Sequence, residues 1–235
     1  MPKKASDVDI WLKRETPHVR KALENASSYF DNKDKFNVNT LEAIYAQESS
    51  FGILKRERGS KAPAGEFHLG VATAKRYGLT VTKENDQRFD IDYASITAAR
   101  YLKDLNKFFA KKTPLLKDLT TIPIQDISER RYFVLAAYNA GEGSIAKAQR
   151  LALQAGKDPT SWNDVKEFLK AADFDAKKVK EIRDYIENVP KNEAEFAKKS
   201  LADKKAKDRK ISKPKSQHSE CRWITKDGHH ILICD

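Results

Sequence analysis

The sequence has no apolar run that approaches the roughly 20 residues of a membrane-spanning helix, so no transmembrane segment is expected. Its opening stretch, MPKKASDVDIWLKRE, is basic but has no apolar centre, so no ordinary secretory signal is visible. Export would then use another route, or a signal has been removed from the chain.

Cysteine is scarce, with two in 235 residues, and neither a C-x-x-C pair nor an H-x-x-x-H spacing is present. A metal site is therefore disfavoured, and no cofactor is expected. Motifs of known nucleic-acid readers are also lacking, and we expect no nucleic-acid partner although the net charge is +11. That charge attracts polyanions, among which anionic cell-wall polymer is an alternative to nucleic acid.

Apolar residues make up 40% of the chain, which is enough for a globular core, and their spacing is helical over most of its length. The spacing predicts an all-α domain. We expect a helical lead-in at 1–38, a catalytic domain at 39–190, a Lys-rich linker at 191–217 and a C-terminal β-hairpin at 218–235. Asn39 is predicted to cap the first helix of the domain, and Pro190 to stop the last one. The other predicted helices cover about 71–77, 93–109, 128–138, 144–155, 162–172 and 179–189.

The final stretch, CRWITKDGHHILICD, predicts a hairpin, because Asp227-Gly228 is a favoured two-residue turn. Cys221 and Cys234 are equidistant from this turn and would meet where side chains are closest. We expect a Cys221–Cys234 disulfide, and with it an oxidising compartment. A metal site that uses the cysteines with His229 or His230 is the alternative.

Glu48 occupies the core-facing stripe of its predicted helix, with Leu41, Ile44 and Tyr45. Loss of hydration there would raise the pKa of the carboxyl, as a general acid for a glycosidic oxygen requires. From this feature alone, a solvated or Arg-paired Glu at a helix end is the stronger interpretation.

The context of Glu48 changes that balance. The segment Glu48-Ser49-Ser50-Phe51-Gly52 resembles the E-S-x-F-G signature of family 1 lytic transglycosylases, bacterial murein-cleaving enzymes with a goose-lysozyme-like fold. Further segments resemble other motifs of the family, in the family's order. Gly65-Glu66-Phe67-His68-Leu69 resembles its G-x-M-Q-[IL] loop, and Thr73-Ala74 with Gly78 resembles its T-A-x-x-x-G helix. The helix of Ile96, Ala98, Tyr101, Leu102 and Leu105 resembles its I-x-A-x-x-Y-L-x-x-L helix, Ala136–Gly141 its A-A-Y-N-A-G motif and Glu181–Ile186 its E-T-R-x-Y-V motif.

The resemblance implies roles for these positions. Glu48 would protonate the glycosidic oxygen between N-acetylmuramic acid and N-acetylglucosamine and then act as base, leaving a 1,6-anhydro end. Ser49 would contact the sugar beside the cleavage point, and Tyr138 and Asn139 would line the cleft. Tyr185 would hydrogen-bond the catalytic carboxyl.

The glycine-led loop departs from the family pattern. His68 replaces a Gln, and as a donor and acceptor it can still bind sugar. Glu66 replaces an apolar residue. A solvent-facing Glu66 is favoured, but as a second acid facing Glu48 it would position a water, and the enzyme would be a hydrolytic muramidase. Glu57 and Asp92 are weaker candidates for that task, and a non-catalytic glycan-binding or assembly module is the remaining alternative.

The expected partner is therefore the peptidoglycan glycan strand, in the periplasm or cell wall. The missing signal and the C-terminal appendage suggest an effector delivered by a specialised secretion machine, or a phage-borne enzyme. An effector would be matched by an inhibitor protein in the cell that produces it.

Overall fold

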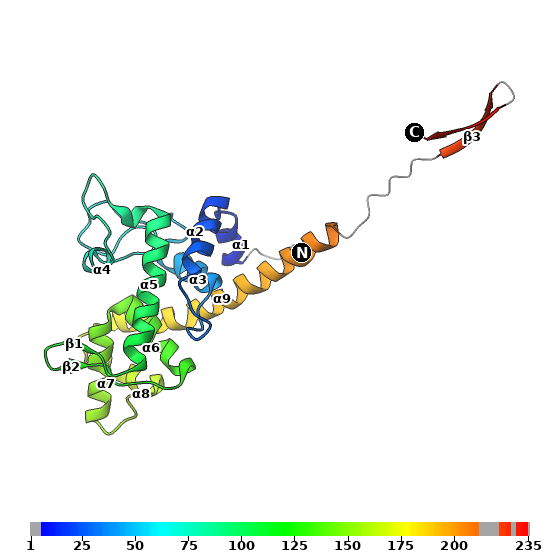
Figure 1. The fold of residues 1–235 in the computed structure, drawn as a ribbon. Helices are drawn as coiled ribbons and strands as arrows, with labels where there is room; N and C mark the ends of the chain where they lie inside the picture. Colours follow the sequence, from blue (N-terminus) through cyan, green and yellow to red (C-terminus); the bar gives the residue numbers. More distant parts are fainter. Residues whose placement is uncertain (1–5, 212–220, 227–228, 235) are drawn as a thin grey trace. The chain divides into compact units, whose positions relative to one another are not determined.

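The computed structural model describes residues 6–211, 221–226 and 229–234. The chain divides into a compact unit, Met1–Ala197, and a second one, Lys198–Asp235. Apart from one short hairpin, the regular secondary structure in the described part of the first unit is helical, and the predicted all-α class is confirmed (Figure 1). The described helices are α1 (Asp7–Leu12), α2 (Pro17–Ser27), α3 (Val38–Ser49), α4 (Val71–Arg76), η1 (Gln87–Phe89), α5 (Ile91–Ala110), α6 (Ile127–Ala140), α7 (Glu142–Gln154), α8 (Trp162–Val165), η2 (Lys166–Phe168) and α9 (Ala176–Ile211).

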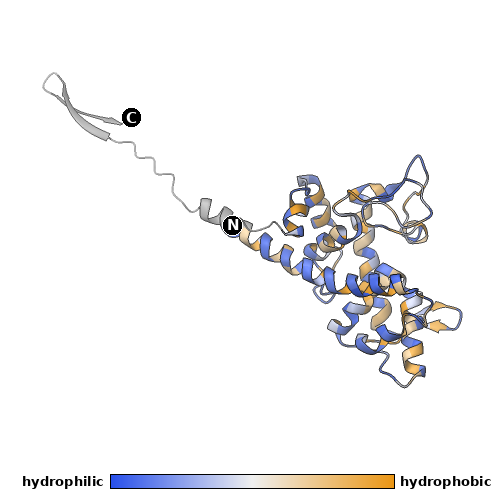
Figure 2. Cartoon of the chain, turned by 180° about the vertical axis from the view of Figure 1, so that it is seen from behind, coloured by the Kyte–Doolittle hydropathy of each residue, from blue (hydrophilic) through white to orange (hydrophobic). Residues whose placement is uncertain are grey.

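The core of the first unit lies around α5, which contacts α2, α3 and α6. Its buried face includes Leu102, Leu105 and Phe109, and Phe109 meets Phe133 of α6 with ring centroids 5.9 Å apart. Hydrophobic and hydrophilic residues alternate along the helices of this unit, as expected for helices with one buried face (Figure 2). The loop after α5 holds a short hairpin of β1 (Pro114–Leu116) and β2 (Leu119–Thr120).

The helix that carries Glu48 begins two residues earlier than predicted. Asn37, rather than Asn39, is the N-cap, and its side chain accepts from the backbone N–H of Asn39 at 2.8 Å and of Thr40 at 3.3 Å. Thr40 bonds back to the amide of Asn37 and completes a capping box. The sequence has an Asn at both positions, and the reciprocal Thr40 decides between them.

The chain turns sharply after α3. Ser50, Phe51 and Gly52 all have positive φ, at 53°, 57° and 77°. The lead-in holds this corner: Trp11 of α1 donates its indole N–H to the Ser50 hydroxyl at 3.1 Å, and Arg14 donates to the Ser50 carbonyl at 2.9 Å. The lead-in thus packs against the end of α3, next to Glu48.

Pro190 does not stop the last helix, contrary to the sequence-based expectation. The helix α9 runs from Ala176 to Ile211 with Pro190 inside it. A proline in a helix interior costs about 3 kcal/mol. Packing on both sides offsets this cost, because Val189 and Phe196 are buried and Phe196 stacks on Phe51 at 5.9 Å between centroids. Residues 191–211 of the predicted linker are therefore helical.

The second unit contains a hairpin of β3 (Cys221–Lys226) and β4 (His229–Cys234). Its register pairs Cys221 with Cys234 and Lys226 with His229, as the sequence predicted. The predicted turn, 227–228, lies outside the described residues, and so do the two cysteine side chains, so the disulfide stays a prediction. In the described part of the chain, no helix is both long and apolar enough to cross a membrane.

Candidate active site

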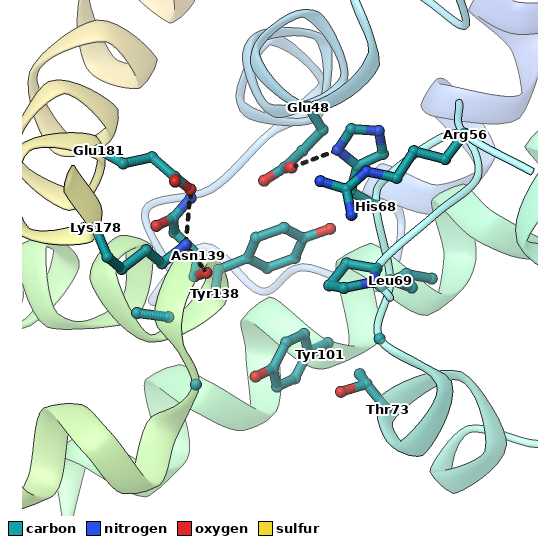
Figure 3. Close-up of a pocket in the computed structure, with 14 residues that line it drawn as sticks. Glu48, Arg56, His68, Leu69, Thr73, Tyr101, Tyr138, Asn139, Lys178 and Glu181 are labelled. Atoms are coloured by element: carbon teal, nitrogen blue, oxygen red, sulfur yellow. Dashed lines mark hydrogen bonds and ion pairs between the residues drawn. The ribbon is translucent and has the colours of Figure 1, made fainter. Parts of the chain in front are cut away.

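A cleft of about 430 Å³ opens beside the C-terminal end of α3 (Figure 3). Segments from six regions of the chain converge on it: the end of α3, the loops before α4, α4 itself, the middle of α5, the end of α6 and the start of α9. The lining residues are Glu48, Arg56, Pro63, His68, Leu69, Gly70, Thr73, Tyr101, Tyr138, Asn139, Ala140, Gly141, Lys178 and Glu181.

Glu48 reaches the cleft from the last turn of α3. Its side chain is 12% exposed, so the carboxyl is largely withdrawn from water but open to the cleft. Its Oε2 lies 3.4 Å from Nδ1 of His68. The carboxyl therefore lies where it can meet a bound molecule, with an imidazole as its neighbour (Figure 3).

His68 lies on the loop before α4 in a left-handed backbone conformation, with φ of 44°. Its Nε2 lies 2.6 Å from the carbonyl oxygen of Leu54. Both ring nitrogens therefore have a partner, Nδ1 in Glu48 on the last turn of α3 and Nε2 in Leu54 on the loop that follows it.

Two tyrosines lie beside Glu48. Tyr138, from α6, donates to the carbonyl of Phe67 at 3.2 Å. Burial first, and then the nearby Glu48 carboxylate, raise the pKa of the Tyr138 phenol, and the same two causes raise the pKa of Tyr185 on α9. Both phenols therefore stay protonated and can act as hydrogen-bond donors. The buried hydroxyl of Tyr185 has no hydrogen-bond partner among the described residues, although Glu48 lies close enough to act on its pKa.

The opposite wall of the cleft is a hydrogen-bonded group of three residues. Asn139 donates its amide to Oε1 of Glu181 at 3.1 Å, and Lys178 donates to the same oxygen at 2.7 Å and to the Asn139 carbonyl at 3.1 Å. Burial favours a higher pKa for Glu181, but the bonds from Lys178 and Asn139 outweigh it, so the pKa is lowered and the group stays ionised. Oδ1 of Asn139 is buried and has no partner among the described residues.

A profile of the transglycosylase SLT domain matches residues 26–160, which is more than half of the chain. The chain belongs to this family. The match begins in α2 and ends after α7, so it includes Glu48, His68, Tyr138 and Asn139.

Relatives of this SLT-family chain are named membrane-bound lytic murein transglycosylase F. The protein from Desulfosudis oleivorans is 29% identical over 154 residues, which cover 65% of this chain and 28% of that protein. The Maricaulis maris protein is 36% identical over 105 residues, covering 45% and 19%. The Thiobacillus denitrificans protein is 35% identical over 129 residues, covering 55% and 23%. The chain thus spans less than a third of the length of these curated relatives.

Ser49, the next residue of the SLT-family signature, does not line the cleft. Its side chain is fully buried, and its hydroxyl donates to the Tyr45 carbonyl at 3.3 Å and accepts from the Gly52 amide at 3.0 Å. The expected sugar contact is therefore not available in this structure. Ser49 instead holds the corner that follows Glu48.

Glu66 is not the solvent-facing residue that was favoured, and it does not line the cleft as a second acid. It is 4% exposed, accepts a 2.7 Å hydrogen bond from the Tyr45 hydroxyl and forms an ion pair with Lys55. The apolar position of the family pattern is thus filled by a carboxylate whose charge is compensated within the fold. Glu57 and Asp92 do not line the cleft either, and Asp92 pairs with His18 at 2.8 Å.

Sequence reasoning assigned no site role to Arg56, Tyr101, Lys178 or Glu181. Tyr101 was recognised only as part of a structural helix, yet it lines the cleft and donates to Glu142 at 2.7 Å. Glu181 opens the last family motif, which is the one sequence signal that could have found it. Nothing in the sequence pattern distinguishes Arg56 or Lys178 from the other basic residues.

Among the residues that the structure describes, no group of three or more His, Cys, Asp or Glu could hold a metal ion.

Proposed function

We propose that this chain is a peptidoglycan lytic transglycosylase that cleaves the β-1,4 bond between N-acetylmuramic acid and N-acetylglucosamine and leaves a 1,6-anhydro end. The observation that carries the proposal is the placement of Glu48, a shielded carboxyl open to a glycan-sized cleft. Membership in the SLT family and the names of the relatives support the same reaction class.

Glu48 acts first as general acid. It donates a proton to the glycosidic oxygen while the substrate's own acetamido group stabilises the sugar carbon that loses this oxygen. Glu48 then acts as base and takes the proton of the C6 hydroxyl, which closes the anhydro ring. The tyrosines Tyr138 and Tyr185 stay protonated beside it. Tyr138 donates to the Phe67 carbonyl, so the Tyr185 hydroxyl is the donor available to orient the carboxylate.

The other carboxylate that lines the cleft supports this single-acid mechanism over hydrolysis. Glu181 is ionised and is held by Lys178 and Asn139. A hydrolase that inverts or retains needs a second carboxylate free to activate water or attack the sugar. Glu66, the earlier candidate, is buried in its own ion pair.

Sugar binding is assigned to the wall opposite Glu48. The unpartnered Oδ1 of Asn139 can accept a hydrogen bond from an amide or hydroxyl of the glycan, and burial without such a partner is costly. Arg56 supplies donors on the other side, whereas both ring nitrogens of His68 already have partners. The mixture of cations and polar groups suits a neutral sugar that carries a peptide with free carboxylates.

The proposed site of action is the periplasm or cell wall, where this polymer lies. The relatives are named membrane-bound, which describes those proteins. Delivery by a specialised secretion machine or a phage, and a matching inhibitor protein, remain predictions for this chain.

Digestion of purified sacculi by the purified protein tests the proposal. Mass analysis of the released sugars should find anhydro ends, which are lighter than reducing ends by one water. Reducing ends alone would identify a muramidase. Absence of release, or release that is unaffected by Glu48→Gln, would overturn the proposed enzyme, and absence of release would favour a glycan-binding module instead.

A further inference from the structure

The imidazole of His68 lies between two oxygen atoms, and the hydrogen bonds that they can form determine which ring nitrogen carries a proton. A backbone carbonyl can only accept a hydrogen bond, so the 2.6 Å contact between Nε2 and the Leu54 carbonyl requires a proton on Nε2. The neutral ring then has its lone pair on Nδ1, 3.4 Å from Oε2 of Glu48. Only one tautomer fits, and it presents an acceptor to the carboxyl.

This orientation is built into the backbone. Leu54 donates its amide to the carbonyl of Ser49 at 2.8 Å, so the residue that orients His68 is tied to the residue that follows Glu48. His68 itself takes a left-handed conformation that a non-glycine residue seldom adopts. Such strain persists where the surroundings over-determine the geometry, and it is typical of functional positions.

A single proton between His68 and Glu48 has two alternative positions, on Nδ1 or on Oε2. It can rest on the ring, giving an imidazolium next to a carboxylate, or on Glu48, giving a neutral imidazole next to a carboxylic acid. In water an imidazole holds a proton more tightly than a carboxylate by about two pKa units, which favours the ion pair. Exclusion of water favours the neutral pair, because it penalises both charges.

We propose that His68 stores the proton with which Glu48 begins cleavage, and that the two side chains carry one shared proton in the active enzyme. The inference rests on the proposed function. Binding of the glycan covers the pair, whose side chains are 18% and 12% exposed, and the proton moves from Nδ1 to Oε2. Glu48 then passes it to the glycosidic oxygen as the C–O bond breaks. The C6 hydroxyl later returns a proton to Glu48, so the pair ends the cycle with one proton, as it began.

The charged and titratable groups around the pair come from the loop before α4 and from three helices. They are Arg56 from the loop, Tyr101 from α5, Tyr138 from α6, and Lys178, Glu181 and Tyr185 from α9. Lys55 and Glu66 are paired with each other nearby, and Lys178 with Glu181. A substitution at His68 leaves all of these groups in place, so a change in pH dependence can be assigned to the shared proton.

The test is the pH profile of kcat/KM for cleavage in wild type and His68→Gln. Glutamine is the residue of the family pattern at this position, so the variant should fold. Without the imidazole, the carboxyl has no partner with which to share the proton, and the alkaline limb of the profile should move to lower pH. The ratio of activity at pH 5.5 to that at pH 7.5 should therefore rise about tenfold. The matched control is His18→Gln, which removes an exposed His paired with Asp92 and should leave the profile unchanged.

A purely structural role for His68 would lower activity equally at every pH, and that result would overturn the proposal while leaving the proposed function intact. Nitrogen-15 spectra provide a readout that does not need activity. They should show a proton on Nε2 of His68 in wild type and, in Glu48→Gln, fewer molecules with a proton on Nδ1, because the carboxylate partner is gone. Spectra that Glu48→Gln does not change, or a neutral ring protonated on Nδ1, would also overturn it.

Discussion

The hydroxyl of Tyr45 donates a hydrogen bond of 2.7 Å to Oε2 of Glu66, and this contact joins α3 to the loop that carries His68. Tyr45 lies one turn before Glu48, and Glu66 lies two residues before His68. Burial and the Glu66 carboxylate both raise the pKa of the Tyr45 phenol, which keeps its proton for this bond. The two residues thus set the spacing across which Glu48 and His68 face each other.

Glu66→Gln should therefore reduce stability rather than change the reaction. The substitution removes the charge that compensates Lys55, whose side chain is 32% exposed, and we expect a loss of about 1–2 kcal/mol after allowance for that exposure. Thermal unfolding measures the loss. The ratio of anhydro to reducing ends should stay as in wild type. If reducing ends were lost in the variant, Glu66 would be the acid that activates water.

Glu48→Gln should reduce sacculus cleavage by about 10²–10⁴-fold, the usual contribution of a general acid. Glutamine keeps the shape of the side chain, so the unfolding temperature should change little. Glu57→Gln is the matched control, since Glu57 is an exposed loop carboxylate outside the cleft. Equal loss in the two variants would show that cleavage does not depend on Glu48 in particular.

Tyr185→Phe separates catalysis from stability. The hydroxyl is buried and unpartnered among the described residues, and such a group costs about 1–3 kcal/mol, so its removal should leave the unfolding free energy unchanged or higher. Cleavage should fall about tenfold, because we expect the hydroxyl to donate to the Glu48 carboxyl once the glycan is bound. Tyr132→Phe, at a half-exposed position outside the cleft, should change neither quantity. Full activity of Tyr185→Phe would mean that the hydroxyl never contacts Glu48.

Asn139→Ala should act on substrate binding. With Oδ1 removed, the glycan loses a hydrogen bond in both its ground state and its transition state, so KM should rise about tenfold with a smaller change in kcat. Asn163→Ala, which removes an amide partner of Lys166 outside the cleft, is the control. An unchanged KM would place the sugar elsewhere.

The stability of the protein should fall as pH rises from about 5 to 8. Burial raises the pKa of Glu42 from 4.5 to about 8, despite its 2.5 Å ion pair with Arg20. The folded state therefore binds a proton that the unfolded state releases over this interval, and the associated stability is lost as pH passes the folded pKa.

Glu42→Gln should flatten that dependence, because its amide cannot release a proton. Unfolding temperatures between pH 5 and 9 measure the effect, and about 1 kcal/mol corresponds to roughly 2–4 °C in a protein of this size. Glu24→Gln removes an exposed partner of the same Arg20 and should keep the wild-type slope. A wild-type unfolding temperature that is constant over this range would contradict the prediction.

Helical periodicity and short motifs predicted the parts of the site that lie on helices. The resemblance to the family motifs pointed to Glu48 and Asn139, and both side chains line the cleft of this structure. The partners of these residues were not predictable in the same way. Lys178 and Glu181 meet Asn139 across about forty residues of sequence, and no local pattern encodes such a contact.

The errors have physical causes of the same kind. The resemblance assigned Ser49 to the sugar, but as the last residue of α3 it is buried, and its hydroxyl bonds the Tyr45 carbonyl and the Gly52 amide. Pro190 was expected to end α9, but buried side chains on both sides outweigh a local preference. In each case tertiary packing overrode a rule that considers only neighbours along the chain.

The left-handed corner after α3 has a bearing on how the signature could be transferred to another protein. A methyl group on Gly52 would come within 2.8 Å of both the Glu66 carboxylate and the Tyr45 hydroxyl, so the backbone and the buried ion pair occupy the same small volume. A graft of residues 38–52 onto a different helical scaffold would lack Trp11, Glu66 and Phe196, and its left-handed residues would relax. The segment from Glu48 to Gly52 would therefore not keep its active conformation in another scaffold. That conformation depends on residues distant in the sequence, which a motif search does not include.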